Sequence, residues 1–209
     1  MFERIYVPYK FNANEEFVIN RYYRSYTDWS NLHLDGVKSD LKSYLRIQQE
    51  NECCYCRQTL GYDYRQVDIE HIVDKKGHDK FGFEPKNLAL SCPACNSCKT
   101  NLEILVDPSV SEYPVNSDSF LIVHPYYDNY SEHIEINYPV FTAKTPKGSK
   151  TIKCCQLERL INVENRQKET MLKIPIIKSV IQNYTINECE QDIFDALIDI
   201  IREGASEKD

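Results

Sequence analysis

The chain has 209 residues, of which 42% are apolar and 27% charged, with six glycines and nine prolines. This composition is typical of a globular protein and excludes a disordered or collagen-like chain. No stretch approaches the roughly 18 consecutive apolar residues of a membrane-spanning helix, and residues 1–6 lack the features of a secretory signal, so we expect a cytoplasmic protein with no membrane partner.

Most of the net charge of −7 lies near the C-terminus. Residues 185–209 contain eight acidic residues and only two basic ones, which leaves the rest of the chain nearly neutral. A nearly neutral surface can still carry local basic patches. The acidic composition therefore does not exclude a nucleic acid as partner.

Residues 1–51 are predicted to form an N-terminal helical region. An aromatic and basic stretch over residues 14–29 and a second apolar pattern from Ser39 onward both follow helical spacing. The arginines and tyrosines of the first stretch have two interpretations. They either contact a nucleic-acid backbone and stack on bases, or they belong to an amphipathic helix that packs on the core.

Nine cysteines in a chain expected to be cytoplasmic indicate metal binding rather than disulfides. Two pairs have the C-x-x-C spacing of zinc knuckles: Cys53 with Cys56, and Cys92 with Cys95. Four thiolates from two such turns supply the tetrahedral sulfur shell of a structural zinc site. A thioredoxin-like redox site needs one pair at a helix start, and a zinc deaminase needs its His-x-Glu before the cysteines, so neither class fits.

Residues 52–105 contain both cysteine pairs and are predicted to form a compact ββα unit. Apolar runs at residues 67–73 and 87–90 predict two short strands. A short helix is expected near residues 97–102, directly after the second cysteine pair. The cysteine pairs would then lie at the joints between these elements.

Residues 106–209 are predicted to contain short strands followed by helices. We expect strands at residues 120–123 and 133–138, and a long helix over residues 151–172. A capping box at residues 185–188 predicts a last, acidic helix. The acidic face of this helix is either solvated or docks on a basic partner surface.

Several residues of the 52–105 segment occur in a characteristic order. They are Asp68-x-Glu70-His71-Ile72-Val73, then Asn87-Leu88, then Cys92-x-x-Cys95-Asn96-x-x-Lys99. Together they resemble the HNH nuclease motif in its His-Asn-Asn form. The resemblance implies an α+β fold, in which a ββα-metal HNH core with two CxxC zinc knuckles lies inside an α-helical frame.

Hydrolysis of a phosphodiester needs a base that activates water and a cation that offsets charge in the transition state. Histidine titrates near neutrality, whereas Mg²⁺ or Mn²⁺ prefers oxygen ligands, which Glu70 and Asn96 can supply. By resemblance, His71 is the general base, Asn96 is a metal ligand, and Asn87 holds the His71 loop in place. Three basic residues are expected to contact DNA phosphates: Lys75, Lys76 and Lys99.

Residues 124–134 and 157–166 resemble, more loosely, the C-terminal half of prokaryotic anti-phage HNH effectors of the Septu type, which also occur with some retrons. This resemblance implies a DNA-cleaving effector controlled by an ABC/SMC-like ATPase, with a retron reverse transcriptase and its DNA product as further partners. Two alternatives stay open. One is a non-catalytic zinc module that binds DNA or protein, and the other is an HNH enzyme that cleaves RNA.

Overall fold

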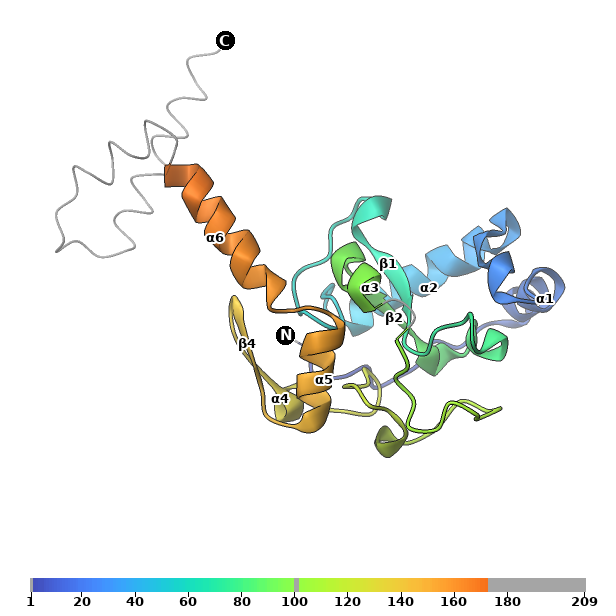
Figure 1. The fold of residues 1–209 in the computed structure, drawn as a ribbon. Coiled ribbons are helices and arrows are strands. Elements are labelled where there is room, and N and C mark those ends of the chain that lie inside the picture. The colour runs from blue at the N-terminus through green and yellow to red at the C-terminus, as the bar shows by residue number, and fades with distance from the viewer. Residues whose placement is uncertain (1, 100–101, 173–209) are drawn as a thin grey trace, which may run out of the picture. The chain divides into compact units, whose positions relative to one another are not determined.

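The computed structural model describes residues 2–99 and 102–172 (Figure 1), which combine helices with two small antiparallel sheets. The chain therefore has the mixed α and β composition expected from its sequence. Its internal contacts group Met1–Glu158 into one unit and Arg159–Asp209 into another. Within the described ranges, every helix is too short or too polar to span a bilayer.

Helix α1 (Ala13–Tyr22) begins with a capping box built by Asn12, whose side-chain oxygen accepts backbone N–H groups of the first turn. The helix ends well before residue 29, the end that the sequence pattern predicted. The Asp28 carboxylate accepts the backbone N–H groups of Arg24, at 2.8 Å, and of the residue after it. Such local side-chain bonds favour a turn over continued helix.

Helix α2 (Asp35–Gln48) packs one face on the core of the first unit. Three buried residues recur every four positions on this face: Val37, Leu41 and Leu45. The helix contacts strand β2 (Leu88–Ser91). The Gln49 side chain completes this link, because it donates to the Leu90 carbonyl and accepts the Leu90 N–H.

Strands β1 (Asp68–His71) and β2 pair as an antiparallel hairpin, with His71 opposite Leu88. Helix α3 (Pro93–Lys99) follows β2 and packs against β1 (Figure 1). A proline is favourable at the first helical position, where an N–H would have no partner in the helix. Strand β1 thus forms within its predicted run and β2 extends one residue beyond its run, while the helix begins earlier than predicted.

The apolar run at residues 120–123, which predicted a strand, is buried except for Leu121 and forms no strand. Phe120 makes only an isolated antiparallel bridge with Leu105. The N–H of Val123 donates instead to the Thr151 hydroxyl, at 2.8 Å. A buried loop can satisfy its backbone groups in this way, so apolar content alone did not identify a strand.

Two buried tyrosine hydroxyls from residues 126–130 donate hydrogen bonds to the cysteine-rich region. Tyr126 donates to the Leu88 carbonyl at 2.7 Å. Tyr130, which begins the short helix α4 (Tyr130–His133), donates to the Tyr55 carbonyl at 2.6 Å. The segment C-terminal to the cysteine-rich region therefore packs on that region rather than apart from it.

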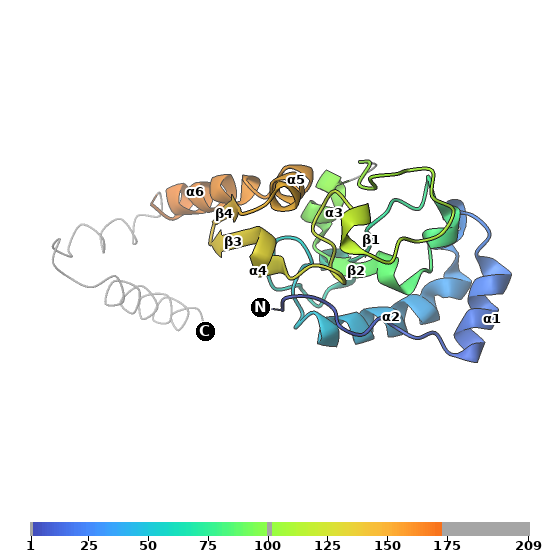
Figure 2. The same ribbon diagram turned by 90° about the horizontal axis from the view of Figure 1, so that it is seen from below.

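A second hairpin consists of β3 (Ile134–Asn137) and β4 (Val140–Ala143). Strand β3 lies within the strand predicted at residues 133–138, whereas β4 was not predicted. Helix α5 (Pro146–Cys154) packs against β4, as both views show (Figures 1 and 2). Gly148 permits a close approach there, because a Cβ atom would lie 2.0 Å from the carbonyl oxygen of the last α4 residue.

The long helix predicted over residues 151–172 is two helices, α5 and α6 (Arg159–Leu172). Gln156 lies between them with a φ of 48°, in the left-handed region that a right-handed helix cannot pass through. Helix α6 belongs to the second unit. The acidic last helix predicted from residue 185 lies outside the described residues.

Candidate active site

Four cysteines from two separate knuckles converge on one point. The Sγ atoms of Cys53, Cys56, Cys92 and Cys95 all lie within 4.8 Å of one another. The Sγ atoms of Cys56 and Cys92 are 3.9 Å apart. Zinc–sulfur bonds of about 2.3 Å in a tetrahedral centre separate the sulfurs by about 3.8 Å, so the four cysteines could bind a metal ion such as zinc.

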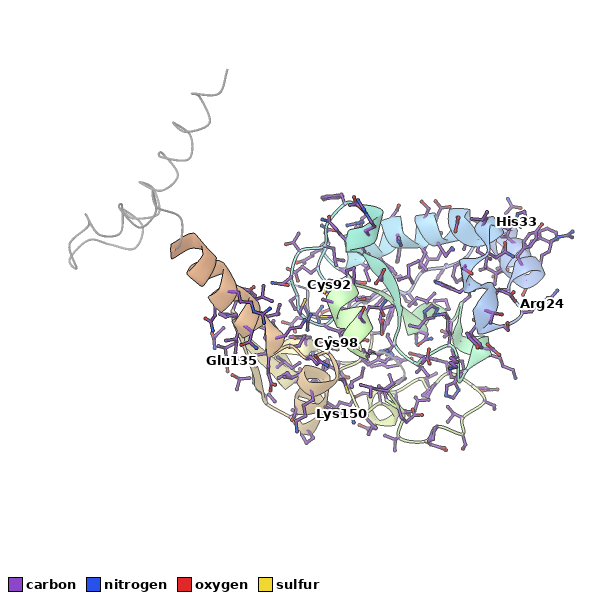
Figure 3. The ribbon with its side chains drawn as sticks, turned by 45° about the horizontal axis from the view of Figure 1, so that its top comes forward. Arg24, His33, Cys92, Cys98, Glu135 and Lys150 are labelled. Atoms are coloured by element: carbon purple, nitrogen blue, oxygen red, sulfur yellow. The ribbon has the colours of Figure 1, made fainter. Side chains whose placement is uncertain are left out.

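The local backbone brings these sulfurs together. The N–H of Cys54 donates to a β2 carbonyl at 2.9 Å, while Cys92 leads from β2 into α3 (Figure 3). The N–H of Cys92 donates to Cys53 Sγ at 3.3 Å, and the N–H of Cys95 donates to Cys92 Sγ at 3.4 Å. These donors stabilise sulfur in its thiolate form. Cys54 and Cys98 lie outside the cluster.

His71 ends β1 and is only 6% exposed. Its ring packs edge-on against Trp29, with the centroids 4.3 Å apart, and its Nε2 lies 3.1 Å from the Gly82 carbonyl oxygen. Because a carbonyl can only accept, Nε2 carries the proton and Nδ1 carries the free lone pair. Burial, together with the charge of Lys75, lowers the pKa of His71 to about 3, so the ring is neutral at physiological pH.

Asn87 is fully buried just before β2 and is bonded to the loop that follows His71. Its Oδ1 accepts the Val73 N–H at 2.7 Å. Its Nδ2 donates to the carbonyls of Val73, at 3.1 Å, and Phe81, at 2.9 Å. These three hydrogen bonds join the two ends of the loop after β1.

The two carboxylates of β1 lie on one face of the strand, because alternate residues of a strand share a face. On this face, Asn96 Nδ2 donates to Asp68 Oδ2 at 2.9 Å. One helical turn further along α3, Lys99 Nζ lies 2.6 Å from Glu70 Oε1, which also accepts the Tyr55 hydroxyl at 2.9 Å. Burial raises the pKa of Glu70, although Lys99 opposes the shift.

These pairings differ from the sequence-based expectation for two residues. Glu70, expected to share a metal ion with Asn96, is 2% exposed and paired with Lys99. Lys99, expected to contact phosphate, is 5% exposed, and its ammonium also donates to the His71 carbonyl at 2.9 Å. The partner of Asn96 is instead Asp68, to which the motif assigned no role.

Asp68 and Asn96 line an open pocket of about 700 Å³. Of the lysines expected to contact DNA, Lys75 also lines this pocket, and Lys76 is exposed in the same loop. Sequence reasoning missed other residues of the lining, among them Trp29, Lys38 and Lys42. The i, i+4 spacing of Lys38 and Lys42 is a sequence pattern that could have identified these two lysines, since such residues share a helix face.

No family model matches the chain, and no solved structure matches it. A comparison with curated proteins finds similarity to the Septu protein PtuB of Bacillus thuringiensis, with 25% identity over 123 residues. The aligned part covers 59% of this chain and 43% of PtuB, so the chain spans less than half the length of this relative. The chain is therefore distantly similar in sequence to a Septu protein, over part of the length of each chain.

Proposed function

We propose that this protein is a metal-dependent HNH-type endonuclease that hydrolyses DNA phosphodiester bonds. The observation that carries the proposal is that a histidine and a pair of oxygen donors lie near one another around strand β1. His71, with its proton fixed on Nε2, ends β1 against the Trp29 ring, and the Asp68–Asn96 oxygen pair opens onto the pocket that Trp29 lines. A base and a set of oxygen ligands beside a basic pocket are the parts that phosphodiester hydrolysis requires.

The remaining donors of the Asp68–Asn96 pair suit a hard divalent ion. Their one mutual hydrogen bond leaves the Asn96 amide oxygen and one Asp68 carboxylate oxygen without a hydrogen-bond partner in the described part of the chain. Mg²⁺ and Mn²⁺ prefer such oxygen ligands and keep several waters, so two protein ligands suffice. When bound, the ion would offset negative charge on the phosphate in the transition state.

In the proposed reaction, His71 Nδ1 accepts a proton from the attacking water. The water oxygen forms a bond to phosphorus as the bond to the leaving oxygen breaks, and the leaving oxygen takes a proton from solvent. The Gly82 carbonyl holds the ring in the tautomer that this step requires. Asn87 acts indirectly, as the residue that fixes the loop between His71 and Gly82.

Zinc in the four-cysteine cluster would have a structural role in this scheme. Cys92 and Cys95 flank the start of α3, and Asn96 follows them directly. Metal binding at the cluster would therefore fix the helix that presents Asn96 to Asp68. It would also contribute folding free energy directly.

The similarity to a Septu protein supports a role in anti-phage defence as the nuclease effector. The partners implied by the sequence resemblance, an ABC/SMC-like ATPase and a retron reverse transcriptase with its DNA product, belong to the same proposal. A partner that delivers DNA would suit a chain whose net charge is −7, because affinity for bulk DNA comes mainly from cationic charge.

A cleavage assay tests the proposal. Plasmid DNA and RNA are incubated with Mg²⁺ or Mn²⁺ and wild-type protein, His71→Ala or His33→Ala, with and without a candidate ATPase. His33 is exposed on the surface (Figure 3) and serves as the matched control. We expect His71→Ala to lower DNA cleavage by about 10²- to 10⁴-fold, as for loss of a general base, and His33→Ala to leave it unchanged.

Other outcomes contradict the proposal in distinct ways. Cleavage of RNA but not of DNA would show that the substrate is RNA rather than DNA. DNA binding with no cleavage under any condition would favour the non-catalytic module. Asp68→Asn and Glu70→Gln separate the two candidate ligands, since only the true ligand should shift the Mg²⁺ concentration needed for half-maximal rate.

A further inference from the structure

The pocket beside Asp68 and Asn96 has a second wall, formed by helix α2. Lys38 and Lys42 lie one turn apart on this helix, and both line the pocket. Lys38 Nζ donates to the Trp29 carbonyl at 3.1 Å and lies 2.6 Å from an Asp35 carboxylate oxygen. Lys42 Nζ donates to the Val67 carbonyl at 3.3 Å. Backbone carbonyls thus hold both ammonium groups at the pocket.

The cations of this pocket are not fully compensated. Among the residues that the structure describes, neither Lys42 nor Lys75 has a carboxylate oxygen within 4.0 Å, the distance of an ion pair. Burial lowers the pKa of both lysines, although Asp68 opposes the shift for Lys42, and Asp74 and Glu70 oppose it for Lys75. Three lysines, Lys38, Lys42 and Lys75, line the pocket against two carboxylates, Asp35 and Asp68. An excess of partly desolvated cations is a favourable environment for an anion.

Trp29 connects the lysines to the proposed base. Its ring lies 5.8 Å from Lys38 Nζ and 5.8 Å from Lys75 Nζ, within the range of a cation–π contact. The same ring packs against His71. Trp29 therefore contacts both the pocket and His71, and the Asp68–Asn96 pair lines the pocket itself.

We infer that the pocket binds the phosphate backbone of a nucleic-acid strand, and that Lys38 and Lys42 of α2, with Lys75, contact phosphates next to the one that a divalent ion held by Asp68 and Asn96 would bind. The inference rests on the proposed nuclease function, because it names the binding track of that substrate. It assigns substrate binding to a helix outside the predicted nuclease segment of residues 52–105. Three lysines on two walls suit successive phosphates better than one small anion.

Binding without cleavage tests this inference. Fluorescence anisotropy follows labelled 20-nucleotide single-stranded DNA, duplex DNA and RNA, with no Mg²⁺ or Mn²⁺ added. The test variant is Lys38→Gln with Lys42→Gln, because glutamine keeps a hydrogen-bond donor but removes the charge. The matched control replaces two exposed lysines of α5, Lys150→Gln with Lys153→Gln, of which Lys150 is labelled in Figure 3.

We expect the α2 double variant to bind at least about tenfold more weakly at 0.1 M salt, with the control unchanged. Loss of two phosphate contacts should reduce the slope of log K against log salt by about 1.4 for single strands and about 1.8 for duplex. Lys75→Gln alone should lower the slope by about half as much, and it provides the test if the double variant fails to fold. The three nucleic acids show which source of phosphodiester the pocket prefers.

Two results would overturn the inference. One is a wild-type protein that binds none of the three nucleic acids, and the other is an α2 variant with the affinity and salt slope of the control. If such a variant accompanies His71-dependent cleavage, the nuclease function stands and only the binding track is wrong. If binding depends on the α2 lysines and no cleavage occurs, the track stands and the nuclease function fails.

Discussion

Replacing Asn87 with alanine should remove the hydrogen bonds that hold the loop after His71. The variant loses three bonds, each worth about 1 kcal/mol net, and leaves the buried Val73 N–H without its partner, which costs a further 1 kcal/mol or more. The Phe81 carbonyl keeps one partner, because it also accepts the Glu84 N–H at 3.2 Å. We therefore expect the free energy of unfolding to fall by about 3 to 5 kcal/mol.

Urea unfolding followed by tryptophan fluorescence measures this change. The chain has one tryptophan, Trp29, whose ring lies against His71, so its emission reports on this region. Asn14→Ala is the control, because Asn14 is exposed on α1 and should change stability by less than about 0.5 kcal/mol. A loss below 1 kcal/mol for Asn87→Ala, with unchanged hydrogen exchange of the Val73 amide, would refute the reasoning.

Three other substitutions test separate features. Cys92→Ser should abolish zinc binding, measured by elemental analysis, and lower the melting temperature, whereas Cys98→Ser should alter neither; a variant that retains zinc would contradict the four-cysteine site. Gly148→Ala should destabilise by about 1 to 3 kcal/mol because its Cβ meets a backbone carbonyl, while Gly36→Ala, with open space around it, should stabilise by about 0.5 to 1 kcal/mol; equal effects in urea unfolding would count against this packing. Lys99→Met leaves a buried carboxylate unpaired and should cost about 3 to 5 kcal/mol, and replacing that carboxylate by glutamine as well should restore part of the loss; no recovery in the double variant would argue against the pair.

The cysteine cluster could be predicted from sequence because its chemistry restricts the possibilities. Four thiolates at knuckle spacing have few uses other than a shared metal, and the sulfurs of Cys53, Cys56, Cys92 and Cys95 do come together. The two strands of the first hairpin could also be predicted, since β1 and β2 coincide closely with short apolar runs beside these knuckles. In both cases a short sequence pattern, the C-x-x-C spacing or the apolar run, was sufficient for the prediction.

The features that the sequence did not reveal depend on contacts between distant segments or on backbone conformation. Periodicity shows that Asp68 and Glu70 share a face of β1, but only the register of α3 decides that Asn96 lies over Asp68 and Lys99 over Glu70. The α2 lysines reach the site through packing of a helix some 30 residues before the strand, which no local pattern encodes. The helix break at Gln156 likewise depends on a backbone conformation that the apolar spacing does not reveal.

The placement of the two knuckles also determines the chain topology around the site. The 35 residues between Cys56 and Cys92 include His71 and Asn87, so a metal ion bound to the four sulfurs would close the segment into a loop fixed at its base. If closure acts as a covalent cross-link does, restricting the unfolded chain over such a length would favour folding by about 3 to 4 kcal/mol. Metal loading and pairing of β1 with β2 would then be one cooperative event, because each brings the same two chain segments together.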